Sequence, residues 1–180
     1  MNTIGYTYNI PNNNSSVSLF NCFDIRFFNT DINSITYYED YTGEYSVEPT
    51  LNLLSLCVEI NILNQLKVYC DGDAELPTQL LNIDYINPCD IYYGNHHATN
   101  LNGYYKYFDR LNPKLILLSL NQSTTTPASY LSKYLYYRNE IDVLSTQDQT
   151  LVNIEVKNKT IIIKSGYKFA NNFYDANNLM

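Results

Sequence analysis

The clearest pattern in the chain is an alternation of apolar and polar residues between positions 54 and 62. The polar or small residues at 55, 57, 59 and 61 separate apolar residues at every second position. A period of two is expected of a β-strand with one buried face. The alternating apolar residues are Leu54, Leu56, Val58, Ile60 and Ile62.

A hairpin follows when this strand is paired with the next apolar segment, residues 66–70. Pairing apolar residues with one another fixes the register and leaves a three-residue loop at 63–65. In this register Cys57 and Cys70 face opposite sides of the sheet, so we expect no disulfide between them. The predicted cross-strand pairs are Ile62 with Leu66, Ile60 with Val68, and Val58 with Cys70.

The same alternation predicts more hairpins and strands. In residues 151–165, a two-residue turn of Asn158 and Lys159 would set Val156 opposite Ile161 and Ile154 opposite Ile163. Another hairpin should centre on residues 41–43, where glycine can supply a bulged turn. Further strand candidates are 3–10, 17–28, 79–86 and 114–120, of which 17–28 is apolar on both faces and is expected to be central. Its alternation places Val17, Leu19, Phe23, Ile25 and Phe27 on one face and Phe20, Cys22 and Phe28 on the other.

One segment departs from the alternation. Thr126 can cap a helix whose first residue is Pro127, and apolar side chains follow at helical spacing. We predict one short helix near 127–138. About ten strands, with no visible repeat or linker, indicate a single mainly β domain over 1–180. A two-layer antiparallel β-sandwich is expected, preferably with jelly-roll topology and with a closed barrel as the alternative.

Composition supports one globular domain. The chain has 180 residues, of which 45% are hydrophobic and 16% charged, and a chain of this length can bury a sizeable core. The first residues do not have the pattern of a signal peptide, and no apolar run is long enough to cross a bilayer. We therefore expect a soluble protein that is made without a signal peptide and has no membrane partner.

Charge is unevenly distributed. The formal net charge is −7, with a net of −10 in residues 1–90 and of +3 in residues 91–180. The two halves are therefore electrostatically complementary. An acidic chain with three arginines lacks the basic groove that supplies most affinity for nucleic acid, so no nucleic-acid partner is expected.

No motif predicts a catalytic site. His96 and His97 are adjacent, so both could face one metal ion only in an irregular loop, and further ligands are missing nearby. A nucleophilic pair of Cys89 and His96 would rest on sequence proximity alone. The chain contains no phosphate loop or nucleophile elbow. We predict no enzyme, no metal and no cofactor.

An acidic turn offers a weaker candidate for metal binding. In the sequence DGDAE, Asp71, Asp73 and Glu75 stand at alternate positions and could gather carboxylates around Ca²⁺. The turn lacks the loop length and the glycine position of an EF-hand, so it is predicted to be the solvated end of a hairpin.

Tyrosine is the strongest anomaly of the composition, with 19 tyrosines, 7 phenylalanines and no tryptophan. Tyrosine is enriched in surfaces that recognise other molecules, although it also fills strands well. Two clusters contain more tyrosines than strand formation requires, and together they form the predicted interface. Its residues are Tyr92, Tyr93, Tyr104, Tyr105, Tyr107, Tyr130, Tyr134 and Tyr137.

These observations favour a non-enzymatic structural or assembly protein, which packs against itself or other structural proteins through tyrosine-rich surfaces. By analogy alone, such a chain would suit a component of a viral or phage particle, with the virion as its location. The alternative is a carbohydrate- or receptor-binding module of the same fold class, in which tyrosines stack on sugar rings.

Overall fold

The computed structural model describes ten strands and two helices, and its described residues are 14–28, 55–74, 76–94, 105–119, 134–135, 137–145, 153–158, 160–165 and 167–168. The elements of the main sheet are β1 (Ser16–Leu19), β2 (Phe23–Phe28), β3 (Cys57–Ile62), β4 (Leu66–Cys70), β5 (Ile91–Gly94), β6 (Leu115–Leu118), β7 (Asp142–Ser145) and β10 (Tyr167–Lys168). The remaining elements are α1 (Leu76–Asn82), α2 (Tyr105–Leu111), β8 (Asn153–Lys157) and β9 (Thr160–Ser165).

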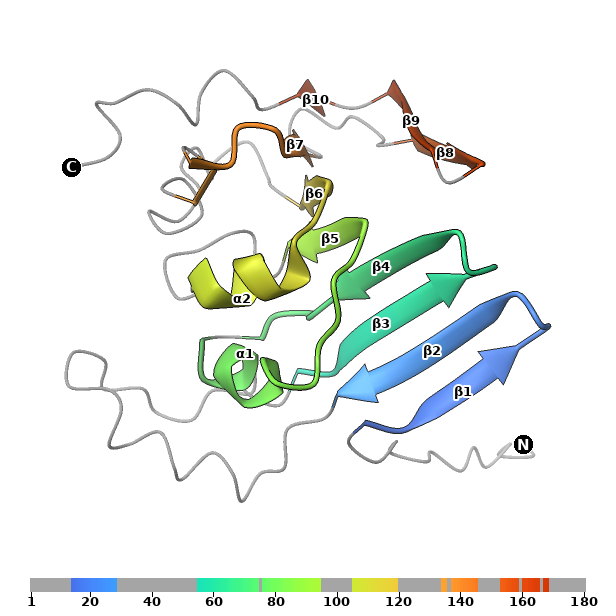
Figure 1. Ribbon diagram of the computed structural model, residues 1–180, viewed down its shortest axis with the longest axis vertical. Coiled ribbons are helices and arrows are strands. Elements are labelled where there is room, and N and C mark those ends of the chain that lie inside the picture. The colour runs from blue at the N-terminus through green and yellow to red at the C-terminus, as the bar shows by residue number, and fades with distance from the viewer. Residues whose placement is uncertain are drawn as a thin grey trace, which may run out of the picture.

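The main sheet is mixed. Its eight strands follow the order β1-β2-β3-β4-β5-β6-β7-β10 (Figure 1). Strands β1 to β4 pair antiparallel, whereas β4, β5, β6 and β7 pair parallel. The prediction of a mainly β protein is confirmed. The parallel pairings differ from the expected antiparallel sheet, and neither the sandwich or jelly-roll arrangement nor the closed barrel is confirmed.

The parallel half is built from a recurring unit of a strand and a long connection. Val68, Ile91, Leu115 and Asp142 lie side by side, so the unit recurs every 23 to 27 residues. A connection of this length is what a parallel pair requires. The repeat belongs to the structure and not to the residue pattern, which explains why the sequence showed none.

The predicted registers of two hairpins are confirmed. Strand β3 pairs with β4 through all three predicted cross-strand pairs, around the loop 63–65. Strand β8 pairs with β9 as expected, with Val156 opposite Ile161 and Ile154 opposite Ile163. The hairpin predicted around 41–43 and the strand predicted at 3–10 lie outside the described residues.

The segment 17–28 is a hairpin and not the single central strand that was predicted. The chain turns at residues 20–22, where Phe20 and Asn21 have positive φ angles, and β1 is the outermost strand of the sheet. The predicted face assignment is right, because Leu19 lies opposite Phe23, so that the apolar residues at odd-numbered positions share one side while Phe28 faces the other.

The structure contains two short helices that the sequence pattern did not predict. The segment 79–86 was expected to be a strand, but α1 occupies its first half, with Pro77 in the first helical turn, where the missing N–H costs nothing. Helix α2 lies in the tyrosine-rich segment and buries Tyr107, Phe108 and Leu111 on one side. Of the helix predicted near 127–138, residues 134, 135 and 137 are helical, while 127–133 and 136 lie outside the described residues.

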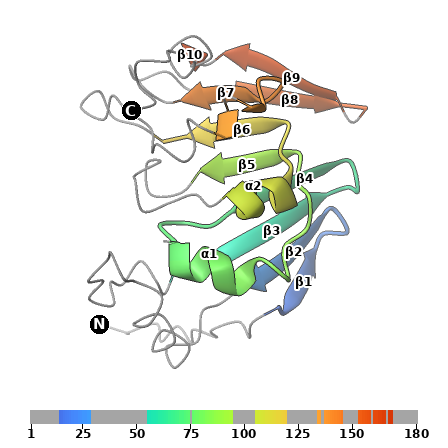
Figure 2. The same cartoon turned by 60° about the vertical axis from the view of Figure 1, so that its left-hand side comes forward.

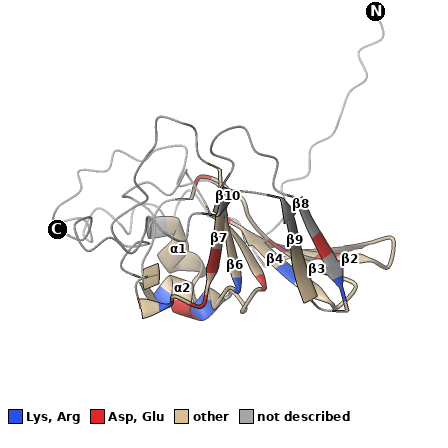
Figure 3. Ribbon diagram, turned by 90° about the horizontal axis from the view of Figure 1, so that it is seen from above, with Lys and Arg blue, Asp and Glu red and all other residues tan. Residues whose placement is uncertain are grey.

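The two faces of the sheet pack against different elements. Helices α1 and α2 lie on one side, here named the helix-covered face, and the hairpin of β8 and β9 lies on the other side (Figures 2 and 3). Under the helices, the main core includes strand residues with exposed fractions of 5% or less. These residues are Phe28, Cys57, Tyr69, Tyr92, Ile116, Leu118 and Val143.

Candidate functional site

A group of apolar side chains on the side opposite the helices is the first candidate for a functional surface. Three of them are exposed by 38% to 40%, and the other four are partly exposed. All seven lie on β1, β2 and β3, and the strand registers place them on one side of the sheet. We name this surface the open patch, and its residues are Val17, Leu19, Phe23, Ile25, Phe27, Val58 and Ile60.

The charged residues of the same strands all face the other way. Asp24 lies opposite Asn61 and Arg26 opposite Glu59, which places them on the helix-covered face. Arg26 is anchored there, because its guanidinium donates to the carbonyl of Tyr85 and lies 4.4 Å from the ring centroid of Phe28. The open patch is therefore uncharged as well as apolar.

The open patch differs from the rest of its own face. Towards β7, that face is covered by the β8–β9 hairpin, whose Ile161 packs with Leu66, Ile91, Leu115 and Leu144. Those four residues of the main sheet have exposed fractions of 7% or less. A second β layer thus covers one end of the face, whereas the patch at the β1 end remains exposed.

The second candidate is a polar cluster on the helix-covered face, centred on Asp71 at the end of β4. Its carboxyl oxygen Oδ2 accepts hydrogen bonds from the hydroxyls of Tyr92 at 3.0 Å and Tyr107 at 3.2 Å, and from the amide of Gln79 at 3.4 Å. The residue is 0% exposed, and its other oxygen, Oδ1, has no hydrogen-bond partner among the described residues.

Tyrosine rings enclose this carboxyl group. The hydroxyl of Tyr107 also lies 2.9 Å from that of Tyr69, and the ring of Tyr69 stacks on that of Tyr92 with centroids 6.3 Å apart. Tyr69 and Tyr92 are neighbours only because β4 and β5 pair in parallel register. The parallel pairing is therefore what assembles the cluster.

Burial raises the pKa of Asp71 to about 8, against the opposing effect of the hydrogen bonds from Tyr92 and Tyr107. The carboxyl group is therefore mostly protonated at neutral pH. Burial also raises the pKa of the neighbouring Cys57 thiol, as does the charge of Asp71 when ionised. Through its hydrogen bonds, the buried Asp71 joins the end of β4 to β5, α2 and α1.

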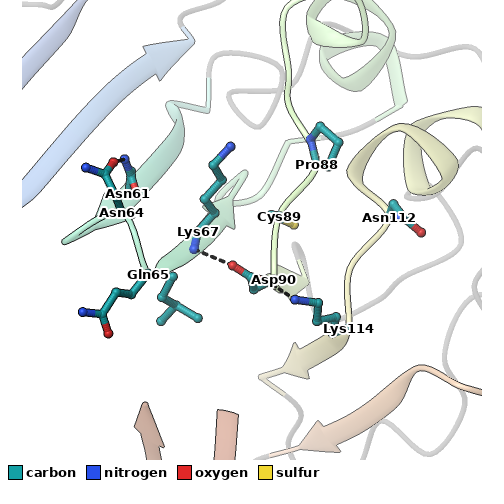
Figure 4. A pocket seen from close by; sticks show the side chains of 10 residues that line it. Asn61, Asn64, Gln65, Lys67, Pro88, Cys89, Asp90, Asn112 and Lys114 are labelled. Atoms are coloured by element: carbon teal, nitrogen blue, oxygen red, sulfur yellow. Dashed lines mark hydrogen bonds and ion pairs between the residues drawn. The ribbon is translucent and has the colours of Figure 1, made fainter. Parts of the chain in front are cut away.

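A polar pocket of about 390 Å³ forms the third candidate (Figure 4). It lies where β5 and β6 begin, and Asp90 is its charged centre. The Asp90 carboxylate pairs with the ammonium of Lys114 at 2.6 Å and accepts the backbone N–H of Lys67 at 2.9 Å. Partial burial raises the pKa of Asp90, but the bonds from Lys114 and Lys67 outweigh it and leave that pKa lowered.

Carboxamides supply most of the remaining polar lining of this pocket, and none of the described residues that line it is aromatic. The Nδ2 group of Asn61 donates to Oδ1 of Asn64 at 2.7 Å. The carboxamide residues are Asn61, Asn64, Gln65 and Asn112.

The structure separates the tyrosines that were predicted to form one interface. Tyr92, Tyr107 and Tyr134 are buried in the core, whereas Tyr93, Tyr105 and Tyr137 are exposed. Tyr104 and Tyr130 lie outside the described residues. Three of the rings therefore pack inside the molecule, and an interface could use the exposed ones only.

The acidic turn was predicted to be solvated, but Asp71 is fully buried. Asp73 is exposed, and Glu75 lies outside the described residues. Gly72 has a φ angle of +57° and turns the chain after β4. Nothing in the local sequence marks Asp71 as buried, since its hydroxyl partners come from β5 and α2.

Of the residues considered as metal ligands or as a nucleophile, Cys89 lies within the described part of the chain. His96 and His97 lie outside the described residues. Burial raises the pKa of Cys89 to about 12, so its thiol stays protonated, and the described cysteines are all free. In the described part of the chain, no three His, Cys, Asp or Glu residues cluster as metal ligands, and no helix is long and apolar enough to cross a membrane.

Comparison with known proteins adds no relative, since neither a protein-family model nor a curated protein matches the chain.

Proposed function

We propose that this chain is a non-enzymatic assembly or scaffold protein that binds another protein through the open patch. The observation that carries the proposal is the separation of side chains on β1 to β3, with seven apolar residues on the exposed side and the charged residues on the other. Contiguous exposed apolar surface of this kind marks interaction sites in globular proteins.

The proposal also includes the sandwich that the alternation pattern predicted. A sheet with an apolar face is stable when a second layer covers that face. Helices cover one face of the main sheet, and the β8–β9 hairpin covers only the β7 end of the other. A partner that covered the open patch would complete a second layer between molecules.

Two leucines on opposite faces test whether the patch is a surface or a core. Leu118 on the helix-covered face is 1% exposed and Leu19 in the patch is 39% exposed. Replacing Leu118 by Ala should cost about 2–5 kcal/mol in free energy of unfolding, and replacing Leu19 by Ala less than about 1 kcal/mol. Equal costs, measured by chemical denaturation in dilute solution, would show that the patch is already a core.

A recognition module remains the second candidate, and the polar pocket is the observation that favours it. Carboxamides can donate to and accept from the hydroxyls of a sugar, but the described part of the pocket lining offers no ring on which a sugar could stack. Titration with neutral oligosaccharides should then shift the side-chain amide resonances of Asn64 and Asn112. The absence of such shifts would dismiss this candidate.

A further inference from the structure

We infer that the polar pocket around Asp90 binds a small polyhydroxylated carboxylate, such as a sugar acid, and that the ammonium of Lys67 pairs with the carboxylate of this ligand. The inference rests on the second candidate function, because it assigns the ligand chemistry of that same pocket. It does not depend on the open patch, since no residue of the patch lines the pocket. Three features of the lining support it.

The first feature is the charge of the lining. Its charged residues are Lys67, Asp90 and Lys114, so two ammonium groups against one carboxylate leave a net charge of +1. The whole chain carries a formal net charge of −7. The pocket is therefore a positive site on an acidic protein, and it attracts an anion that most of the chain repels.

The second feature is that one of the two ammonium groups has no counter-ion. The ammonium of Lys114 takes Oδ1 of Asp90 at 2.6 Å, and the other oxygen of Asp90 accepts the backbone N–H of Lys67 at 2.9 Å. The ammonium of Lys67 has no ion-pair partner among the described residues. Its side chain points away from Asp90 (Figure 4), so an anion in the pocket can pair with it.

The third feature is the orientation of two carboxamides. Oδ1 of Asn64 accepts from Nδ2 of Asn61 at 2.7 Å, and Oδ1 of Asn112 accepts from the guanidinium of Arg138 at 2.8 Å. The Nδ2 groups of Asn64 and Asn112 have no acceptor within the described part of the chain. Both residues therefore offer donors to the pocket, and an ionised carboxylate is an acceptor only.

Two further carboxamides suit hydroxyl groups. Oδ1 of Asn61 is an acceptor for which the described residues supply no donor, and the exposed Gln65 can both donate and accept. A hydroxyl group also does both. The pocket volume of about 390 Å³ lies at the lower end of the range for small-molecule sites. A single sugar ring with several hydroxyls matches this lining.

The charge of the lining favours a carboxylate over a phosphate. One unpaired ammonium balances one negative charge, which is what an ionised carboxylate carries. A phosphate monoester carries about 1.5 to 2 negative charges at neutral pH. Its second charge would meet the Asp90 carboxylate without a further cation from the described lining.

Two lysines provide the test. Lys67 lines the pocket, whereas Lys157 is exposed on β8 and does not line it. Lys67→Gln and Lys157→Gln remove the same charge from the full chain, and Lys67→Gln retains the backbone N–H that binds Asp90. NMR titrations with glucuronate, glucose or inorganic phosphate, read at the side-chain amides of Asn64 and Asn112, give the dissociation constant of each probe.

We expect the unmodified chain and Lys157→Gln to bind glucuronate equally, and at least about tenfold more tightly than glucose, which lacks the carboxylate. Lys67→Gln should bind glucuronate at least about tenfold more weakly and should melt at the same temperature as the unmodified chain, because its side chain is exposed. Undiminished binding of glucuronate by Lys67→Gln would overturn the inference, since the carboxylate would then be bound elsewhere.

Other results separate the inference from the second candidate function. If glucose and glucuronate bind the unmodified chain equally, the pocket recognises hydroxyls alone, and only the inference fails. If phosphate binds at least as tightly as glucuronate, the pocket is a general anion site, and the inference fails again. If no probe shifts the amide resonances, both the inference and the second candidate function fail.

Discussion

The two faces of the main sheet are built from the same strands but have opposite characters. Under the helices, strand residues such as Phe28 and Tyr69 are fully buried, and the hydroxyl of Tyr92 donates to the buried carboxyl of Asp71. On the other side, the open patch has no polar side chain and remains partly exposed. This difference is the basis of our proposal that the helix-covered face stabilises the monomer and that the open patch binds a partner.

The largest effect should come from Asp71, and it tests whether the helix-covered face is sealed. The pKa of Asp71 is about 8 in the folded protein and about 4 in the unfolded chain. The folded state therefore holds a proton that the unfolded state releases, so the stability that this group contributes is complete below about pH 4 and is lost by about pH 8.

The free energy of unfolding should consequently fall by up to about 1.4 kcal/mol per pH unit in this window because of Asp71 alone. Asp71→Asn removes that part of the pH dependence, whereas Asp73→Asn, at an exposed position in the same turn, should not. Urea denaturation at several pH values measures the slopes. Parallel curves for the unmodified chain and Asp71→Asn would show that Asp71 is not sealed.

A smaller effect is expected from two adjacent tyrosines, which sharpen the comparison of the faces. The Tyr92 hydroxyl donates to buried Asp71, so Tyr92→Phe should lower the free energy of unfolding by about 1–3 kcal/mol. Tyr93 is 38% exposed on the other face, and Tyr93→Phe should change it by less than about 0.5 kcal/mol. Equal losses in chemical denaturation would mean that both faces are closed.

Local pairing is what the sequence could predict. The register of β3 with β4 follows from a three-residue loop and a period of two, and both signals lie within neighbouring residues. Leu19 and Phe23 were correctly predicted to face the same side, although the turn between them was not predicted, because the period of two is also a local signal. The sequence could therefore predict which residues form the apolar side of these strands, but it could not predict that this side is exposed.

Loop length and alternation could not predict the pairing of strands that lie far apart in the sequence. Parallel strands such as β5 and β6 are short and almost wholly apolar, so they show no alternation. Helix α2 has only seven residues, and its tyrosines fit a strand or loop equally well. The position of Asp71 depends on both elements, which is why an acidic turn was mistaken for a solvated one.

The most direct test of the central claim compares two phenylalanines of β2 by hydroxyl-radical labelling. Phe23 belongs to the open patch and is 38% exposed, whereas Phe28 is 0% exposed under the helices. In dilute solution, mass spectrometry should find Phe23 oxidised and Phe28 protected. Equal protection of Phe23 and Phe28 in the dilute monomer would contradict the existence of an open interaction face.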